Sequence, residues 1–235
     1  MARRKKKSRL GLIVKLALLL ALIGGGYWLW LQYEQRGWRP DEAVYPDQGA
    51  LVGEGDGAVD FEVLKGLGAG FVYLEASRGA RGKDANFSRN LEAAREAGLQ
   101  VGAVHLFDPC ETADGQSANY VTIVPRDAEL LPPAIRLTRT ADQCFERVSE
   151  AAVQSELLTL VNQIESHTEA PVVLAPGEEF ERRYRPARRL ERALWLDGNM
   201  TEPDYGGRPW TVWTANSAYA SEAAEKPLRW LVVRP

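Results

Sequence analysis

The stretch that decides the fold is residues 70–109, GFVYLEASRGARGKDANFSRNLEAAREAGLQVGAVHLFDP. Its apolar runs at 71–74 and 101–107 predict two strands, and the apolar residues three or four apart between 87 and 97 predict an amphipathic helix that joins them. Two strands joined by a crossover helix form a parallel βαβ unit, which is normally covered on both faces. We therefore predict an α/β fold, in which chemistry lies at the C-terminal ends of the strands.

The rest of the chain extends this pattern toward a closed barrel. Further apolar segments near residues 43, 135, 173, 195, 212 and 231 bring the predicted strands to eight, and the longest helix after the N-terminal region is predicted at 145–167. Helices follow the early strands and become scarce toward the C-terminus, which favours an irregular TIM-like β/α barrel over a doubly wound sheet. We expect the barrel domain to span residues 43–235.

The N-terminal region predicts a membrane anchor. Residues 1–15 carry seven basic residues and no acidic one, and the apolar stretch 10–31 is long enough to cross a hydrocarbon core. A cleaved signal peptide is the alternative, but the stretch shows no convincing cleavage site and ends in aromatic residues 27–30, typical of a membrane interface. We expect a cytoplasmic basic tail (1–9), a transmembrane signal anchor (10–31) and a polar linker (32–42). The positive-inside rule then puts the barrel on the periplasmic or extracytoplasmic side of the inner membrane.

The charge distribution and the two cysteines bear on which ligands and which cross-link the chain can have. The formal net charge is −3, and the chain without its seven N-terminal basic residues has 22 basic against 32 acidic side chains, so nucleic acid is not an expected partner. Cys110 and Cys144 are expected in loops at the same end of the barrel, where they form either a disulfide or two buried thiols. The absence of a CxxC motif or a Cys/His cluster predicts no zinc site, and we predict no cofactor.

Several segments together resemble glycoside hydrolase family 25, the muramidases that cleave peptidoglycan on an irregular β/α barrel. Gln48-Gly49 followed by Val59-Asp60-Phe61 is similar to the family's Q-G-x-I-D-W, and residues 71–79 and 97–107 are similar to its FVYIKATEG and AGLKVGAYHFF. Later matches are the proline pair 132–133, the LWL strand 194–196 and the segment 210–217. The resemblance covers most of residues 43–220 and implies peptidoglycan as the ligand.

The catalytic positions depart from the family pattern. The resemblance places the family's first-strand Asp at Ala43 or nearby, and its Asp-x-Glu at Arg136 and Thr138. Glycoside hydrolysis needs one carboxyl group to donate a proton and a carboxylate to stabilise a cationic transition state. Arginine stays charged and cannot donate, and its charge opposes a cation. We therefore expect this chain not to cleave glycan by the family's mechanism.

Other residues at predicted strand ends give two further hypotheses. The family's lysine in IKATEG corresponds to Glu75, so we expect a Glu75–Arg136 ion pair in the barrel mouth. A rebuilt catalytic set of Glu75, Asp108 and Asp197 would instead support an active enzyme.

Candidate substrate-binding residues are mainly aromatic side chains that could stack on sugars, although core packing is the alternative for most of them. They are Tyr45, Gln48, Tyr73, His105, Trp195 and Trp213.

Three functions remain open from the sequence. The favoured one is a membrane-anchored, non-catalytic muramidase-like domain that binds peptidoglycan glycan strands or an envelope protein. The second is an active peptidoglycan hydrolase that uses the rebuilt carboxylates, and the third is an envelope scaffold without affinity for glycan.

Overall fold

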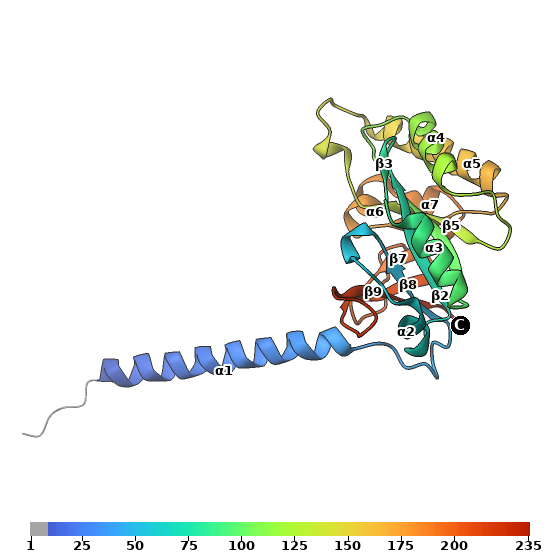
Figure 1. Ribbon diagram of the computed structural model, residues 1–235. Helices are drawn as coiled ribbons and strands as arrows, with labels where there is room; N and C mark the ends of the chain where they lie inside the picture. Colours follow the sequence, from blue (N-terminus) through green and yellow to red (C-terminus); the bar gives the residue numbers. More distant parts are fainter. Residues whose placement is uncertain (1–8) are drawn as a thin grey trace, which may run out of the picture.

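The computed structural model describes residues 9–235, apart from the side chains of 9–12, 31–32 and 34–35. Of the tail predicted at residues 1–9, residues 1–8 lie outside the described residues. Its strands are β1 (Gln48–Val52), β2 (Phe71–Arg78), β3 (Gly82–Lys83), β4 (Gln100–Leu106), β5 (Leu131–Leu137), β6 (Val173–Pro176), β7 (Ala193–Asp197), β8 (Val212–Tyr219) and β9 (Leu228–Val233). Its helices are α1 (Arg9–Gly37), α2 (Phe61–Gly66), α3 (Phe87–Glu96), α4 (Ala113–Ile123), α5 (Glu150–Thr168), α6 (Glu178–Tyr184) and α7 (Pro186–Arg189), with 3₁₀ turns η1 (Glu54–Asp56) and η2 (Ala141–Gln143) (Figure 1).

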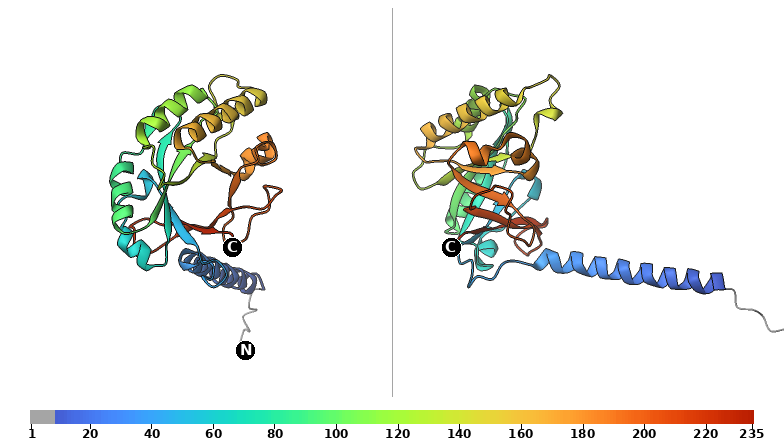
Figure 2. Two further views of the ribbon diagram at one scale, coloured as in Figure 1. Left: turned by 90° about the vertical axis from the view of Figure 1, so that its right-hand side faces the viewer. Right: turned by 180° about the vertical axis from the view of Figure 1, so that it is seen from behind.

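The strands close into a barrel. Their order is β1-β9-β8-β7-β6-β5-β4-β2-β3, and a parallel pairing of β1 with β2 joins the two sides. Eight strands of the described chain thus form the barrel, while β3 is a short antiparallel addition to β2. The strands form a ring when viewed along the barrel axis, with helices around its outer side (Figure 2). Since β9 alone runs antiparallel to both of its neighbours, the barrel is mixed.

Alternate side chains of each strand fill two separate cores. One cluster lies inside the barrel and includes Leu51, Tyr73, Trp195 and Leu231, each at most 4% exposed. The other lies between the strands and the helices, where Leu160 of α5 is fully buried. Each fully buried large apolar side chain contributes about 1.5–3 kcal/mol, so both layers stabilise the closed barrel.

The βαβ unit predicted from residues 70–109 is present as β2, α3 and β4. The two strands pair in parallel from Phe71 with Gln100 onward, with a bulge after Glu75. Gly98, directly after the C-cap of α3, has a φ of +73°, and a Cβ there would lie 2.4 Å from Lys65 Nζ. Both observations explain why the helix ends at a glycine.

Two predicted element boundaries are wrong. The first strand does not lie near residue 43, because Ala43 is an exposed turn residue and β1 begins at Gln48. The long helix does not begin at 145: α5 starts at Glu150, after Ser149 caps it by accepting a hydrogen bond from Ala152 N at 3.1 Å. Residues 145–149 therefore belong to the loop that follows β5.

The N-terminal helix differs from its predicted limits. α1 continues through residues 32–37, so the predicted polar linker is helical over half of its length. Its segment Ile13–Trp30 has a mean hydropathy of 1.7 and no buried residue, which makes it a candidate membrane span by length and composition. A signal sequence would give the same pattern.

Candidate functional site

The C-terminal mouth of the barrel collects the charged residues predicted at strand ends. Glu75, Arg136 and Asp197 lie at or near the C-terminal ends of β2, β5 and β7. These strands run parallel within one barrel, so the three side chains share its C-terminal mouth. The pairing among them, however, is not the predicted one.

Arg136 forms an ion pair with Asp197. Arg136 Nη2 lies 3.0 Å from Asp197 Oδ2, and the guanidinium carbon lies 5.4 Å from the centre of the Trp195 ring. The Asp197 carboxylate also accepts a hydrogen bond from Thr214 Oγ1 at 2.6 Å, and Trp195 Nε1 donates to the same hydroxyl at 2.7 Å. The arginine side chain is 7% exposed and the aspartate 40%, so the buried member of the pair is the cation.

Glu75 pairs with a different arginine. Its Oε1 lies 3.2 Å from Arg229 Nη2 of β9, and its Oε2 lies 3.9 Å from Arg78 Nη2. The predicted Glu75–Arg136 ion pair is wrong, because among the described residues no ion pair within 4.0 Å joins these two side chains. The reason is topological: β1 pairs with both β2 and β9, which brings Arg229 to the side of Glu75. Gly53, just after β1, leaves the space, since a Cβ there would lie 2.7 Å from Glu75 Oε2.

Asp108 is also bound to an arginine. Its Oδ2 pairs with Arg139 Nη1, and its Oδ1 accepts a hydrogen bond from Cys110 N at 2.9 Å. Cys110 and Cys144 form the disulfide that the sequence left as one of two alternatives, and the two cysteines are 34 positions apart. The disulfide ties the loop after β4 to the loop after β5 at this mouth.

The strand ends therefore lack a free pair of carboxylates. β1 has the sequence QGALV without an acidic residue, and its inward-facing Leu51 is fully buried. Thr138 follows the end of β5 and is exposed. Glu75, Asp108 and Asp197 each contact an arginine, and positive charge at these positions opposes an oxocarbenium-like transition state.

A cleft beside β2 contains a carboxyl group that sequence analysis missed. This cleft has a volume of about 500 Å³ and is lined by Glu54, Gly55, Glu75, Ser77, Arg78, Gly82, Lys83, Asp84 and Leu106. Burial raises the pKa of the Asp84 carboxyl, and the nearby charges of Glu54 and Asp56 raise it further. Asp84 Oδ1 accepts a hydrogen bond from Asn86 N at 2.7 Å, so the residue also stabilises the turn before α3. Asp84 directly follows β3, a two-residue strand that the sequence did not predict, so the strand-end argument did not find it.

Most of the candidate substrate-binding residues are buried. Gln48 donates to the Pro40 carbonyl and accepts from Trp230 Nε1, Tyr73 donates to the Pro132 carbonyl, and both are at most 4% exposed. Trp195 and Trp213 are 1% and 3% exposed, so their rings belong to the core and do not offer a free stacking face. Tyr45 is partly buried against Trp213 and bonds Glu202 through its hydroxyl.

His105 is fully buried on the outer side of β4. Its Nδ1 lies 2.7 Å from Ser77 Oγ, and its Nε2 lies 3.1 Å from Gln116 Oε1. The Gln116 Nε2 already donates to two backbone carbonyls, so its Oε1 is the acceptor, His105 Nε2 carries the proton and Nδ1 accepts from the hydroxyl. This network connects β2, β4 and α4 and does not face the mouth.

We expect His105 to make stability dependent on pH. Burial lowers the pKa of its imidazole to about 4. Between about pH 6.5 and pH 4 the unfolded chain binds a proton that the folded chain does not, so stability falls as the pH falls through this window. The loss approaches about 3 kcal/mol. Denaturant unfolding at a series of pH values should show this slope reduced in His105→Gln; equal slopes in both proteins would refute the assignment.

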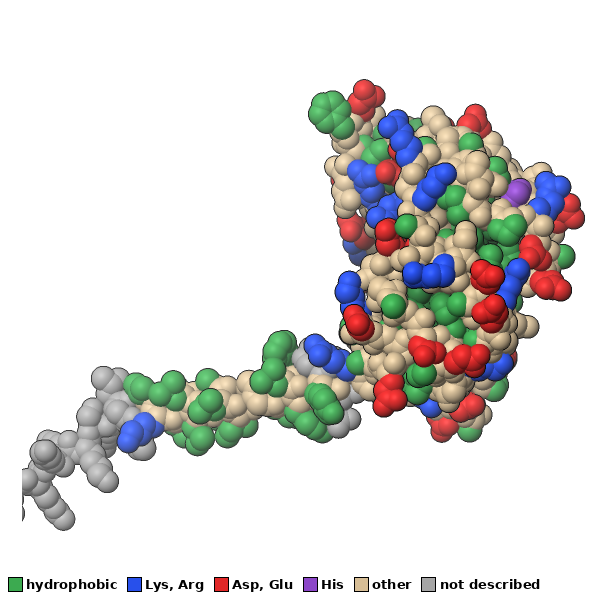
Figure 3. Space-filling view, in the orientation of Figure 1, with side chains coloured by type: hydrophobic (Ala, Val, Ile, Leu, Met, Phe, Trp, Pro, Cys, Tyr) green, Lys and Arg blue, Asp and Glu red, His purple; other side chains and the backbone are tan. Residues whose placement is uncertain are grey.

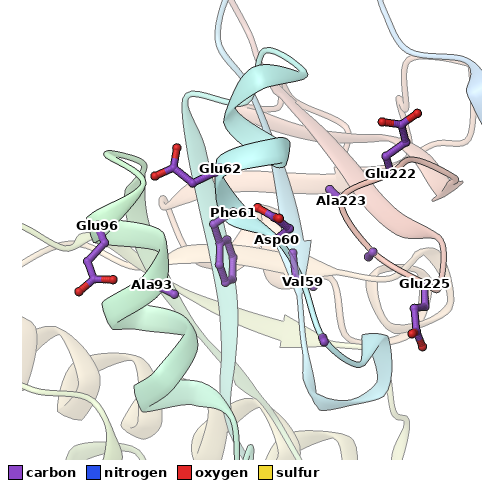
Figure 4. A pocket seen from close by; sticks show the side chains of 11 residues that line it. Val59, Asp60, Phe61, Glu62, Ala93, Glu96, Glu222, Ala223 and Glu225 are labelled. Carbon is purple, nitrogen blue, oxygen red and sulfur yellow. The ribbon is translucent and has the colours of Figure 1, made fainter.

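Two other hollows are present in the described chain. The opposite mouth of the barrel has a cavity of about 800 Å³ with a largely apolar lining that includes Phe71, Tyr73, Val173, Val212 and Val233. An outer hollow of about 520 Å³ lies between α2, α3 and residues 222–225 (Figure 4).

In the outer hollow the carboxylates of Glu62, Glu96, Glu222 and Glu225 point in different directions (Figure 4). Asp60 caps α2 through Val63 N at 3.0 Å and so has a structural role. Over residues 9–235, wherever side chains are described, no group of three or more His, Cys, Asp or Glu side chains is arranged to hold a metal ion.

Comparison with known proteins identifies the family. The model of Glycosyl hydrolases family 25 matches residues 52–222. Lysozyme M1 of Streptomyces globisporus is 33% identical over 73 residues, which cover 31% of this chain and 25% of that protein. The uncharacterized protein YegX of Escherichia coli K12 is 23% identical over 149 residues, or 63% of this chain and 53% of that protein. The chain thus matches between a quarter and about half the length of these curated relatives.

A solved structure shows the same fold. A family 25 glycosyl hydrolase from Bacillus anthracis superimposes with a TM-score of 0.76 at 22% identity, covering 85% of this chain and 93% of that one. The family match spans most of the barrel, from the end of β1 to the segment before β9. The chain belongs to glycosyl hydrolases family 25.

Proposed function

We propose that this protein is a membrane-anchored, muramidase-like domain that binds peptidoglycan without cleaving it by the family's mechanism. The observation that carries the proposal is the Arg136–Asp197 ion pair at 3.0 Å, since it occupies the end of the strand on which the resemblance expects an Asp-x-Glu. Membership of the family supports peptidoglycan as the ligand. The absence of an acidic residue from β1 supports the loss of the carboxylate mechanism.

The proposed organisation follows from α1 and the disulfide. Residues 10–31 anchor the chain in the cytoplasmic membrane, residues 1–9 face the cytoplasm, and residues 43–235 form the barrel outside. The Cys110–Cys144 disulfide supports an oxidising compartment for the barrel. An envelope protein could occupy the same mouth in place of glycan.

The basic residues at the rim of the cleft are the proposed contact to the wall. Arg78 is 70% exposed and Lys83 is also exposed, and both line the cleft beside Glu75. Peptidoglycan carries carboxylates on its peptides, which these side chains can bind as charge-assisted hydrogen bonds.

We expect Arg78→Ala combined with Lys83→Ala to weaken co-sedimentation with purified insoluble peptidoglycan at least fivefold, equivalent to about 1 kcal/mol. Arg126→Ala is the matched control, because Arg126 is 62% exposed and lies in the loop between α4 and β5, at the other end of the barrel. Wild-type protein that fails to co-sediment would favour the scaffold function. If the double variant binds as strongly as the wild type, the contact to peptidoglycan lies outside this cleft.

An active glycosidase is the second candidate, and the cleft supplies the observation that favours it. Glu75 and Asp84 line the same cleft, and the raised pKa of Asp84 is a property of a general acid. Asp108 and Asp197 are less suitable partners for Glu75, because they are bound to Arg139 and Arg136. If the protein cleaves glycan, Asp84→Asn should abolish the cleavage.

A further inference from the structure

The helix α1 leaves the barrel at its C-terminal mouth. Ala220 directly follows β8, which runs parallel to β7, so Ala220 lies at the mouth end of the barrel. Its N–H donates to the carbonyl of Arg36 in the last turn of α1 at 2.7 Å. In the view in which the strands form a ring, α1 is strongly foreshortened, so its axis runs close to the barrel axis (Figure 2). Figure 1 shows α1 extending away from the domain on the mouth side.

The segment after α1 fixes this direction. The Trp38 carbonyl accepts a hydrogen bond from Asn216 Nδ2 at 2.7 Å. The centres of the Trp38 and Trp213 rings lie 6.3 Å apart. The Pro40 carbonyl accepts from Gln48 Nε2 at 3.0 Å. The chain thus runs along the barrel wall from the mouth to the start of β1. Residues 38–40 therefore pack against the barrel and do not form the flexible connection expected of a polar linker.

An exposed aromatic side chain lies at the same end. Outside α1, the exposed large hydrophobic side chains of the described chain are Val44, Val121, Phe145 and Leu158, and only Phe145 is aromatic. Phe145 is 104% exposed and belongs to the loop between β5 and α5, which is at the C-terminal mouth by the direction of β5. Figures 1 and 2 show this loop projecting on the side toward which α1 extends, and a hydrophobic side chain stands at its tip in Figure 3.

The loop that carries Phe145 is braced. Cys144, the preceding residue, is bonded to Cys110, and Arg139 Nη2 donates to the Gln143 carbonyl at 2.9 Å. Asp142 pairs with Arg183 of α6. These contacts restrain the loop while Phe145 stays exposed to solvent. An exposed aromatic side chain on a restrained loop is typical of a site that contacts a membrane or another apolar surface.

The distance along α1 matches a membrane contact. The apolar window of α1 ends at Trp30, and Gly37, at the barrel, is seven positions further along the helix. At 1.5 Å per residue this is about 10 Å, a few ångströms more than the headgroup region of one leaflet, which is about 5–8 Å deep. A domain held this close brings its mouth loops to the lipid surface.

We propose that the barrel docks on the bilayer through the Phe145 loop, with its C-terminal mouth toward the lipid headgroups. The partner is the boundary between headgroups and acyl chains, where aromatic side chains partition favourably. The inference rests on the proposed membrane anchor. It restricts the glycan that the cleft beside β2 can bind to strands that lie within a short distance of the membrane.

Photo-crosslinking of the full chain in liposomes tests the docking. p-Benzoylphenylalanine is introduced separately at Leu22 in α1, at Phe145, and at Val121 on α4 as a solvent-facing control. Lipid adducts are then measured by mass spectrometry after irradiation. We expect adducts at Leu22 and Phe145, with the yield at Phe145 at least about tenfold above that at Val121.

The outcomes separate the two proposals. Adducts at Leu22 with none at Phe145 overturn the docking and leave the anchor intact. The absence of adducts at Leu22 overturns the anchor, and the docking with it. Adducts at Val121 as abundant as those at Phe145 also overturn the docking, because they indicate contact without orientation.

Discussion

Replacing Asp197 by alanine should lower the free energy of unfolding by about 3 kcal/mol, whereas replacing Arg136 by methionine should cost about 1 kcal/mol or less. The asymmetry follows from burial, since the arginine side chain is 7% exposed and the aspartate 40%. Without Asp197 the guanidinium is left as a buried cation over the Trp195 ring, with no ion-pair partner among the described residues. Without Arg136 the carboxylate keeps the Thr214 hydroxyl and access to water.

Denaturant unfolding of the detergent-solubilised chain measures both values. The double variant Arg136→Met with Asp197→Leu should recover most of the loss, because two apolar side chains replace the pair without leaving a charge. If Asp197→Ala costs no more than Arg136→Met, the arginine is not held by this carboxylate, and the description of the mouth is wrong.

Loss of the disulfide should have an effect of similar or greater size. Cys110 and Cys144 are 34 positions apart, and cross-links that close loops of this length stabilise by about 4 kcal/mol in the chain-entropy model. We therefore expect Cys110→Ser combined with Cys144→Ser to lower the free energy of unfolding by about that amount. The single variant Cys144→Ser should lose nearly as much, because it also breaks the cross-link.

The reduced wild-type protein is the control for this experiment. Unfolding curves measured with and without dithiothreitol should reproduce the difference between wild type and the double variant. A stability that neither reduction nor substitution changes would show that the bond contributes no constraint in solution.

The sequence predicted well where local pattern and tertiary contacts agree. Strands β2 and β4 and helix α3 have strong periodicity and a terminal glycine, and they form where expected. The position of the first strand was predicted wrongly, because local propensity favoured residues near Ala43, whereas β1 begins with Gln48-Gly49. Gly49 is required there because a Cβ would lie 2.3 Å from the Phe71 carbonyl oxygen. That need depends on pairing with β2, which propensity does not describe.

The location of the charged residues in the site was predicted, but their ion-pair partners were not. Strand direction placed Glu75, Arg136 and Asp197 at one mouth, but their pairing depends on which strands are neighbours across the closure of the barrel. Arg229 is the partner of Glu75 because β9 runs antiparallel to β1, and the direction of β9 could not be predicted from its residues. The exposure of Phe145 was not predicted either. The predicted helix began at residue 145, whereas α5 begins at Glu150 and leaves Phe145 in a loop.

The most direct test of the central claim is the release of reducing sugar from purified peptidoglycan by the full chain in detergent. The protein is incubated at several concentrations and pH values, and an active family 25 lysozyme serves as the positive control. We predict co-sedimentation with the wall without any release above the buffer blank, because the mouth holds its carboxylates in ion pairs with arginine. Release that grows with time and protein concentration, and disappears in Asp84→Asn or Glu75→Gln, would contradict the account and establish an active hydrolase.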